Sequence, residues 1–243
     1  MARFGLIGKN IDYSFSRGYF KEKFQNLKLD HTYENVDLPS EANLEQFFAN
    51  MPDFKGLNVT IPYKSAVIPF LDELDPVAES IGAVNTIKIT SDNRRIGFNT
   101  DHHGFVKALE PFLPLEDRSA LILGTGGAAA AIVHALANLD FRIQFVSREA
   151  SETALSYEQV NRYVILDHLL IVNCTPLGTF PKVEAHPDIP YDFLSSNHLL
   201  FDLVYNPAET TFMRLGSERG ARVTNGYRML VEQAEKAWEI WNS

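Results

Sequence analysis

Cysteine is almost missing from this sequence: Cys174 is the only one among 243 residues. A single thiol cannot form an intrachain disulfide, and no cysteine and histidine residues are grouped at the spacing of a structural zinc site. His102 and His103 are neighbours, and neighbouring side chains diverge on any regular element, so we expect no metal site there either. The fold must therefore be held together by packing and hydrogen bonds.

Long hydrophobic runs and an excess of basic residues are missing as well. No stretch approaches the roughly 20 apolar residues of a membrane helix, and the opening residues, MARFGLIG, lack the apolar core of a signal peptide. Lys and Arg number 22 against 31 Asp and Glu, a formal net charge of −9. This charge disfavours nucleic acid and anionic membranes as partners. We expect a cytoplasmic protein, monomeric or homodimeric, that binds a small molecule through locally placed donors.

Repeats and low-complexity tracts are absent too, so the domain organisation has to be inferred from the order of strands and helices. In the first hundred residues, strand patterns alternate with helix patterns, and a polar loop holding Ser14 and Ser16 follows the first strand. Strands separated by helices imply an α/β domain with a mainly parallel sheet covered on both faces. The expected strands are 3–8, 31–38, 56–64, 83–89 and 94–100, and the expected helices are 19–26, 43–50, 63–82 and 102–113.

A second unit opens at residue 119, where SALILGTGGAAAAIVHALANL joins an apolar strand to a glycine turn and an alanine-rich helix. Gly124, Gly126 and Ala129 match the spacing G-x-G-x-x-G/A that brings a dinucleotide pyrophosphate close to the backbone at a helix start. We therefore predict a Rossmann dinucleotide-binding domain. Further strand-to-loop exits are expected at 168–179, 198–207 and 221–226, and a closing amphipathic helix at 229–241.

The end of the next expected strand, FRIQFVSR (141–148), bears on the choice of cofactor. An acidic residue at this position binds the ribose 2′-hydroxyl of NAD, but here Ser147 and Arg148 stand there, and a guanidinium suits the 2′-phosphate of NADP. Glu149 and Glu152 would both lie near that phosphate and oppose it. The residues favour NADP and leave NAD open.

The segment NVTIPYKS (58–65) places polar groups in an apolar, strand-like neighbourhood. Asn58 and Thr60 lie two residues apart, so on an extended chain both point to one face. Pro62 lacks a ladder donor and ends the strand, which directs Lys64 beyond the sheet. The pattern fits either an edge strand with a solvated lysine or a polar strand end that presents Lys64 to a site.

With these residues in view, the chain resembles the shikimate dehydrogenase family along nearly its full length. The motifs that carry the resemblance occur in order: Ser14-x-Ser16, NVTIPYK, GAVNT (82–86), NTD (99–101), GTGGAA, NCTPLG, YNP (205–207) and NGYRMLVEQA (225–234).

The resemblance implies an oxidoreductase that reversibly reduces 3-dehydroshikimate to shikimate with NADP, in chorismate and aromatic amino-acid biosynthesis. It also implies an N-terminal α/β substrate domain of residues 1–101, completed by a returning C-terminal helix at 227–243. Residues 102–226 would form the Rossmann NADP-binding domain.

Carried over residue by residue, the resemblance makes Lys64 and Asp101 the catalytic pair. Hydride transfer to a ketone builds negative charge on oxygen, which an ammonium can stabilise and protonate while a carboxylate holds the ammonium in place. The residues implied to bind the substrate carboxylate are Ser14, Ser16 and Thr60. Those implied to bind the ring hydroxyls are Asn85, Asp101 and Gln233, and Tyr205 completes the pocket. The implied cofactor-binding residues are Gly124, Thr125, Gly126, Gly127, Ala128, Ala129, Ser147, Arg148, Thr175, Leu203 and Gly226.

Three departures from the family pattern accompany the resemblance. In the cofactor motif SREASE (147–152), Ser147 replaces the usual asparagine, Glu149 replaces threonine, and Glu152 stands where a second basic residue is common. Arg17 stands where the family usually has proline, and the segment 150–167 is shorter than usual, which opens the adenine side of the cofactor site. Two other functions remain open. One is a quinate and shikimate dehydrogenase that prefers NAD, and the other is a non-catalytic dinucleotide or ligand sensor of the same fold.

Overall fold

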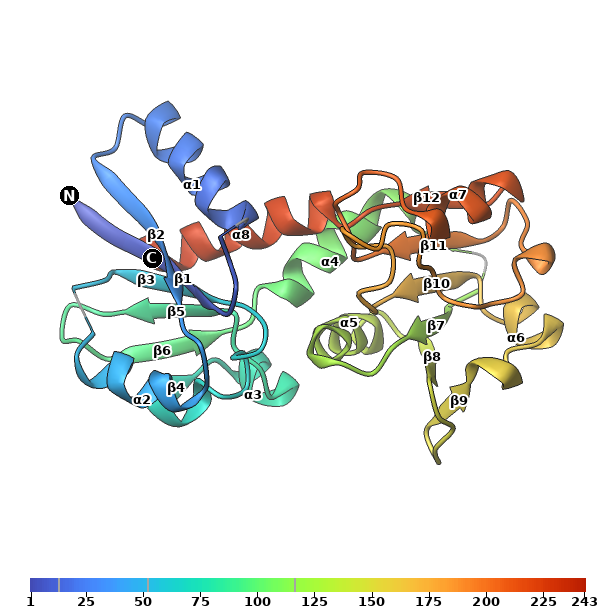
Figure 1. Cartoon of the computed structure of the whole chain (residues 1–243), viewed down its shortest axis with the longest axis horizontal. Coiled ribbons are helices and arrows are strands. Elements are labelled where there is room, and N and C mark those ends of the chain that lie inside the picture. The colour runs from blue at the N-terminus through green and yellow to red at the C-terminus, as the bar shows by residue number, and fades with distance from the viewer. Residues whose placement is uncertain (13, 52, 116) are drawn as a thin grey trace. The chain divides into compact units, whose positions relative to one another are not determined.

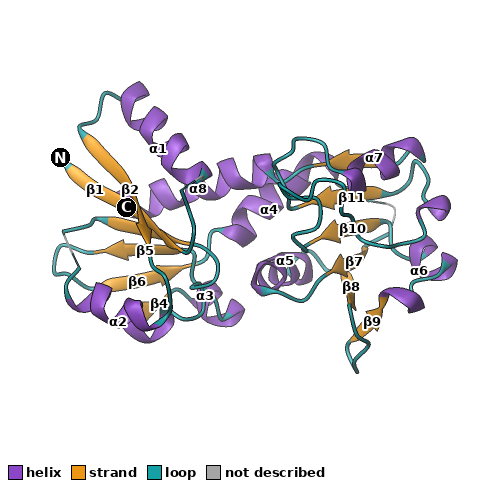
Figure 2. Ribbon diagram, viewed as in Figure 1, coloured by secondary structure: helices purple, strands orange, loops and turns teal. Residues whose placement is uncertain are grey.

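The computed structural model describes residues 1–12, 14–51, 53–115 and 117–243. The chain divides into two compact units, one made of Met1–Thr100 with Ala234–Ser243 and the other of Asp101–Gln233. Within the described residues each unit is built on a six-stranded sheet (Figures 1 and 2). The α/β class expected from the sequence is confirmed.

The first unit has a mixed sheet, with strand order β2-β1-β3-β5-β6-β4. Strand β1 is parallel to β2 and β3, and β4 is parallel to β6, whereas β5 runs antiparallel to both of its neighbours. The parallel pairings thus outnumber the antiparallel ones. In chain order the elements are β1 (Ala2–Gly8), α1 (Phe15–Asn26), β2 (His31–Asp37), α2 (Ala42–Ala49), β3 (Gly56–Val59), η1 (Ile68–Phe70), β4 (Glu73–Leu74), α3 (Pro76–Ile81), β5 (Thr86–Ile89) and β6 (Arg95–Phe98).

The continuous helix expected over 63–82 is wrong. Pro69 and Pro76 would each remove a helical hydrogen bond and clash with the preceding turn. The backbone between them bonds to β6 instead, through Asp72 N–H to Arg95 O (2.9 Å) and Asp75 N–H to Gly97 O (2.8 Å). This stretch therefore adds the edge strand β4 before α3 begins.

The first helix begins earlier than expected. Helix α1 starts at Phe15, and the Ser14 hydroxyl caps it by accepting the N–H of Arg17 at 3.4 Å. Ser16 accordingly lies in the first helical turn and not in a loop, which corrects the expectation. A serine at the cap satisfies an amide that the first turn would leave unpaired.

The second unit has an all-parallel sheet of order β12-β11-β10-β7-β8-β9. The order reverses between β7 and β10, the place where doubly wound folds bind nucleotides. The Rossmann expectation is confirmed. Its elements are α4 (Asp101–Leu109), η2 (Glu110–Phe112), β7 (Ser119–Leu123), α5 (Gly127–Ala137), β8 (Arg142–Ser147), β9 (Ala154–Ser156), η3 (Tyr157–Gln159), α6 (Arg162–Leu166), β10 (Leu170–Asn173), η4 (Tyr191–Phe193), β11 (Leu199–Asp202), α7 (Thr211–Glu218), β12 (Arg222–Thr224) and α8 (Tyr227–Asn242).

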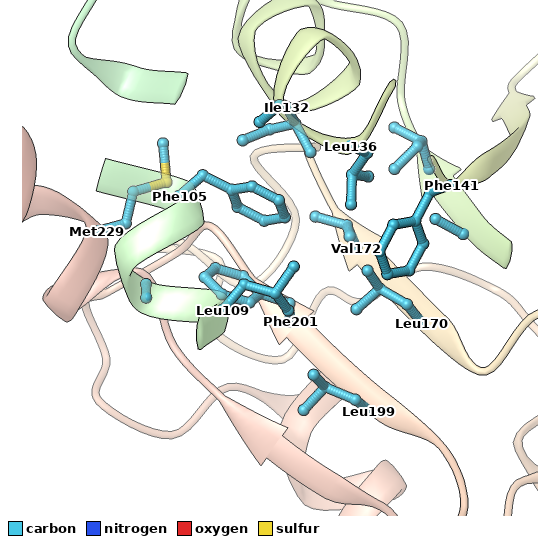
Figure 3. Close-up of a cluster of buried hydrophobic side chains, with 14 of the residues drawn as sticks. Phe105, Leu109, Ile132, Leu136, Phe141, Leu170, Val172, Leu199, Phe201 and Met229 are labelled. Atoms are coloured by element: carbon cyan, nitrogen blue, oxygen red, sulfur yellow. The ribbon is translucent and has the colours of Figure 1, made fainter. Parts of the chain in front are cut away.

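One core of this unit lies between its sheet and the helices α4 and α5. Figure 3 shows Phe105 from α4 directed toward Ile132 of α5, above the strands that carry Val172 and Phe201. The rings of Phe105 and Phe201 lie 4.8 Å apart between centroids. This packing fixes α4, whose first residue is Asp101, to the strands of the sheet.

The C-terminal helix α8 contributes to both units, and its last turns complete the first one. Trp241 donates its indole N–H to Ile87 O at 3.0 Å, and its ring lies 4.8 Å from that of Phe4. A Cβ added at Gly56 would fall 2.2 Å from the Trp241 nitrogen, so only glycine fits beneath the indole. The expected return of this helix to the first unit is confirmed.

None of the helices in the described part of the chain is both long and apolar enough to cross a membrane.

Candidate active site

A buried amide side chain organises the polar end of the first unit. Asn85 is 2% exposed, and its Oδ1 accepts the backbone N–H of Thr100 at 2.7 Å while its Nδ2 donates to the Thr100 hydroxyl at 3.0 Å. These bonds fix both the Asn85 side chain and the peptide that leads into Asp101. Because Asp101 follows Thr100 directly, these bonds also constrain where the Asp101 backbone begins.

A second buried amide, Asn58, links this network to the helix that carries Ser16. Asn58 donates to the Thr86 hydroxyl at 3.1 Å and accepts the hydroxyl of Tyr33 at 2.8 Å. Burial raises the pKa of Tyr33, and a hydrogen bond with Ser16 partly offsets it. Strand β3 lies between β1 and β5, so the edge-strand interpretation of this segment is wrong.

Lys64 follows β3 on a backbone that is tied down on both sides. Its carbonyl accepts the N–H of Val84 at 2.8 Å. The preceding Tyr63 is fully buried and donates its hydroxyl to Leu38 O at 2.5 Å. The Lys64 side chain is half-buried. The Lys64 backbone therefore lies beside Val84, the residue that precedes Asn85.

Two of the expected carboxylate-binding hydroxyls lie around the end of β1. The Thr60 N–H donates to Ile7 O at 2.8 Å, and a Cβ at Gly8 would come within 2.6 Å of the Thr60 methyl group. The Ser14 N–H donates to Ile11 O at 3.0 Å, and the same Cβ at Gly8 would also touch Ile11 at 2.6 Å. Because Gly8 has no side chain, Ile11 and Thr60 can both pack against its backbone.

In the second unit, α4 and α8 approach closely where Gly104 faces Met229 and Gln233. A Cβ added at Gly104 would lie 2.4 Å from Met229 O and 3.0 Å from the Gln233 nitrogen. Asp101 precedes Gly104 by three residues, which puts both on one face of α4. Asp101 is 7% exposed and lies at the helix start, where the helix dipole favours a carboxylate.

The glycine turn after β7 has the geometry that a pyrophosphate needs. Gly124 has φ +103, a conformation that side chains disfavour. Gly126 caps α5 without any side-chain hydrogen bond, and a Cβ added at Gly126 or Gly127 would meet nothing within 4 Å. Ala129 is buried against the sheet. An open helix start with unblocked amides fits an anionic cofactor group, so the residues present suit a dinucleotide.

The remaining residues expected at the cofactor lie at the carboxyl ends of the neighbouring strands. Thr175 lies against Gly124, its methyl group 3.0 Å from where a Cβ would stand. Leu203 N–H donates to Asn173 O at 3.1 Å, and a Cβ at Gly226 would fall 2.2 Å from Leu203 O. Thr125 lies in the glycine turn, Ala128 in the first turn of α5, and Ser147 ends β8. Tyr205, expected in the substrate pocket, follows β11. Their contacts with a ligand stay predictions.

A buried carboxyl group supports this edge of the sheet. Asp202 is fully buried and accepts hydrogen bonds from Thr210 Oγ1 (2.6 Å), Asn173 Nδ2 (2.9 Å) and Val204 N–H (3.0 Å). Burial raises the pKa of Asp202 to about 6, against an ordinary 3.8, although the three donors oppose the shift. Asn173 in turn accepts from the Thr175 hydroxyl at 2.6 Å. Asp202 thus holds the loop that carries Thr175.

A cavity of about 650 Å³ opens beside the end of β8, lined by Arg148, Glu149, Glu158, His186 and Asp188 among others. Glu152, expected near the 2′-phosphate, is not among its lining residues.

Several residues of the site were not expected from the sequence. Tyr33 and Thr86 are ordinary strand residues by pattern, and only the parallel register of β1, β2 and β3 brings Tyr33 to Asn58. Gly104 carried a usable signal, since a glycine inside a helix pattern often marks close helix packing. Among the described residues no group of three or more His, Cys, Asp or Glu side chains is placed to hold a metal ion.

Comparison with known proteins gives consistent matches over nearly the whole chain. A family model described as the shikimate dehydrogenase substrate binding domain matches residues 6–87. A protein named shikimate dehydrogenase (NADP(+)) from Desulforamulus reducens is 37% identical over 266 residues, covering 98% of this chain and 88% of its own length.

Solved structures agree with these matches. Shikimate 5-dehydrogenase from Thermus thermophilus, in complex with NADP(H) and shikimate, is similar with a TM-score of 0.87 at 32% identity, covering 99% of this chain and 93% of that one. Quinate dehydrogenase from Corynebacterium glutamicum, in complex with NAD, is similar with a TM-score of 0.86 at 26% identity, again over 99% and 93%.

Proposed function

Because the chain belongs to the shikimate dehydrogenase family, we propose that it catalyses the NADP-dependent, reversible reduction of 3-dehydroshikimate to shikimate. The observation that carries the proposal is the buried network around Asn85. The Asn85 side chain holds the Thr100 peptide that precedes Asp101, and the N–H of the neighbouring Val84 holds the Lys64 carbonyl. Such a network rigidifies the groups that hold a polyhydroxylated substrate.

In this proposal Lys64 and Asp101 act as a unit on the reacting oxygen. During reduction the Lys64 ammonium stabilises the negative charge that develops on the carbonyl oxygen and donates the proton to it. In the reverse direction the amine takes the proton from the hydroxyl. The Asp101 carboxylate orients the ammonium and accepts a hydrogen bond from a ring hydroxyl.

In this proposal neutral hydroxyl and amide groups bind and orient the substrate. The hydroxyls of Ser14, Ser16 and Thr60 donate hydrogen bonds to its carboxylate. The Asn85 and Gln233 amides bind ring hydroxyls, with Tyr205 closing the pocket. A site made of hydroxyls and amides rejects analogues that lack a matching hydroxyl, because its buried polar groups would be left unpaired.

The glycine turn at Gly124–Ala129 and the strand ends at Arg148, Thr175, Leu203 and Gly226 would hold the cofactor, which supplies or accepts the hydride when bound. We propose that residues 1–101 with 227–243 form the substrate domain and residues 102–226 the NADP-binding domain.

The test of this function is shikimate oxidation followed by cofactor absorbance, run with NADP and NAD side by side. Turnover of shikimate with NADP is the expected result. Absence of turnover with either cofactor, together with tight binding of a dinucleotide, would instead favour the non-catalytic sensor.

A second candidate is an enzyme that oxidises quinate as well as shikimate and uses NAD. It is favoured by the acidic residues around Arg148 and by the likeness to quinate dehydrogenase. Quinate in place of shikimate, with each cofactor in turn, separates the two candidates.

A further inference from the structure

The connection after β8 forms part of the wall of the cavity beside Arg148. Between β8 and β10 the chain forms the three-residue strand β9, the 3-10 turn η3 and the five-residue helix α6. The turn η3 is closed by a reciprocal cap, in which the Ser156 N–H donates to Gln159 Oε1 at 2.8 Å. Glu158 lies within this turn and lines the same cavity as Arg148.

The charges that face this cavity are mostly negative. Its charged or titratable lining comprises Arg148 from the end of β8, Glu149 beside it, Glu158 and Tyr157 from η3, and His186 and Asp188 from the loop before η4. The His186 ring faces Glu184 O through Nδ1 at 3.0 Å. Arg148 forms no ion pair in the part of the chain that the structure describes. One guanidinium thus stands among three carboxylates.

We propose that Glu158 and Asp188, together with Glu149, are specificity-determining residues that weaken binding of the NADP 2′-phosphate at Arg148, so that the protein accepts NAD alongside NADP. The inference deepens the proposed function and rests on its assignment of Arg148 to the cofactor. A 2′-phosphate brings a charge of about −1.5 to −2, which each carboxylate repels, whereas a ribose hydroxyl can donate a hydrogen bond to a carboxylate.

Two carboxylates that approach the cavity from different elements make the proposal testable. For a doubly charged phosphate about 8 Å from one carboxylate in a water-like dielectric, removing that carboxylate should tighten binding about fivefold. The effect should shrink to about twofold at physiological ionic strength, where the Debye length is about 8 Å.

The experiment measures dissociation constants of NADPH and NADH by fluorescence titration, beside steady-state shikimate oxidation. In wild type we expect binding and turnover with both cofactors. Glu158→Gln and Asp188→Asn should each tighten NADPH roughly threefold to tenfold at low ionic strength, while the NADH constant stays within about twofold. Arg148→Ala should weaken NADPH and leave NADH nearly unchanged.

Glu152→Gln is the matched control, since it removes an equal charge close by in sequence but outside the cavity lining. It should change neither constant. The proposal is overturned if Glu158→Gln and Asp188→Asn leave NADPH binding unchanged, if both cofactors tighten equally, or if the control behaves as they do. It is overturned also if wild type binds NADPH alone. If wild type binds the cofactors as expected but does not oxidise shikimate, the proposed function fails while this inference stands.

Discussion

At the scale of single residues, the role proposed for Lys64 depends on its charge and not on the bulk of its side chain. Lys64→Met keeps most of the aliphatic stem and removes the ammonium. It should lower kcat for shikimate oxidation by roughly 10²- to 10⁴-fold, with a smaller change in KM. Near-normal kcat in this variant would contradict the assignment.

Asp101→Asn supplies the companion measurement. Because the two side chains would act as a unit, the double variant should lose far less than the product of the two single losses. Losses that multiply would mean that Lys64 and Asp101 act independently.

Ser14 caps helix α1 and is also proposed to bind the substrate. Two variants separate these two roles. Ser14→Ala removes both, so it should lower the free energy of unfolding by about 1 kcal/mol and raise KM for shikimate by roughly tenfold or more. Ser14→Asp can still cap α1, so its stability should be kept while its negative charge repels the substrate carboxylate. If shikimate binds the Asp variant as well as wild type, Ser14 is a cap alone.

Asp202 should make stability depend on pH in an unusual direction. Its pKa is about 6 in the folded protein against an ordinary 3.8, so between these values the folded protein keeps a proton that the unfolded chain releases. The contribution of Asp202 to the free energy of unfolding should therefore fall as pH rises from about 4 to about 6, by about 3 kcal/mol at about 1.4 kcal/mol per pH unit. Folding lowers the pKa of Asp72 and of Glu235, which act in the opposite direction but are common to wild type and Asp202→Asn, so urea unfolding should show the fall in the difference between the two proteins. Parallel pH profiles would contradict it.

At the scale of elements, strands and helices with one strong pattern were predictable and composite segments were not. The stretch SALILGTGGAAAA gave β7, its glycine turn and α5, because period, glycine spacing and helix propensity all agree. The prediction of one continuous helix over 63–82 is wrong because the apolar residues of this stretch fit a helix while Pro69 and Pro76 interrupt it. Hydrogen bonding to β6, which lies far along the chain, decides its structure, and no local pattern carries that information.

The site divides in the same way. Polar groups within motifs, such as Asn85 and Lys64, could be proposed as functional from the sequence. Their supports could not, because Tyr33 and Asp202 owe their roles to strand register and burial. The acids at the cavity are a further case, because Glu158 and Arg148 line the same cavity from different elements, η3 and the end of β8.

Two glycines in different elements should respond oppositely to the same added methyl group. Gly104→Ala puts a Cβ 2.4 Å from Met229 O, so α4 and α8 must separate. This variant should lower the free energy of unfolding by about 1–3 kcal/mol and raise KM for shikimate, because Gln233 is displaced. Gly126→Ala meets no atom within 4 Å, so stability should change by less than about 1 kcal/mol while KM for the cofactor rises about tenfold or more. Thermal unfolding and kinetics of both variants check this, and a reversed pattern would contradict both assignments.

At the scale of the whole molecule, the last turns of α8 are part of the first unit's core. Trp241 is 8% exposed, and its ring lies 4.8 Å from Phe4 and 5.2 Å from Phe20. Trp241→Ala should destabilise the first unit by about 3–5 kcal/mol. Trp241→Phe, which keeps a ring but loses the N–H to Ile87 O, should cost about 1 kcal/mol. Urea unfolding followed by far-UV circular dichroism measures both, and an unchanged midpoint in the Ala variant would refute the prediction.

The same indole sets an order of events during protein synthesis. Phe4 and Phe20 leave the ribosome long before Trp241 is made, a wait of roughly 10–40 s at translation rates of about 5–20 residues per second. The second unit is one continuous stretch, Asp101–Gln233, and has all its strands before Trp241 emerges. The unit whose synthesis starts first is therefore the one that finishes folding last, and the nascent chain carries an uncovered aromatic surface through most of its elongation.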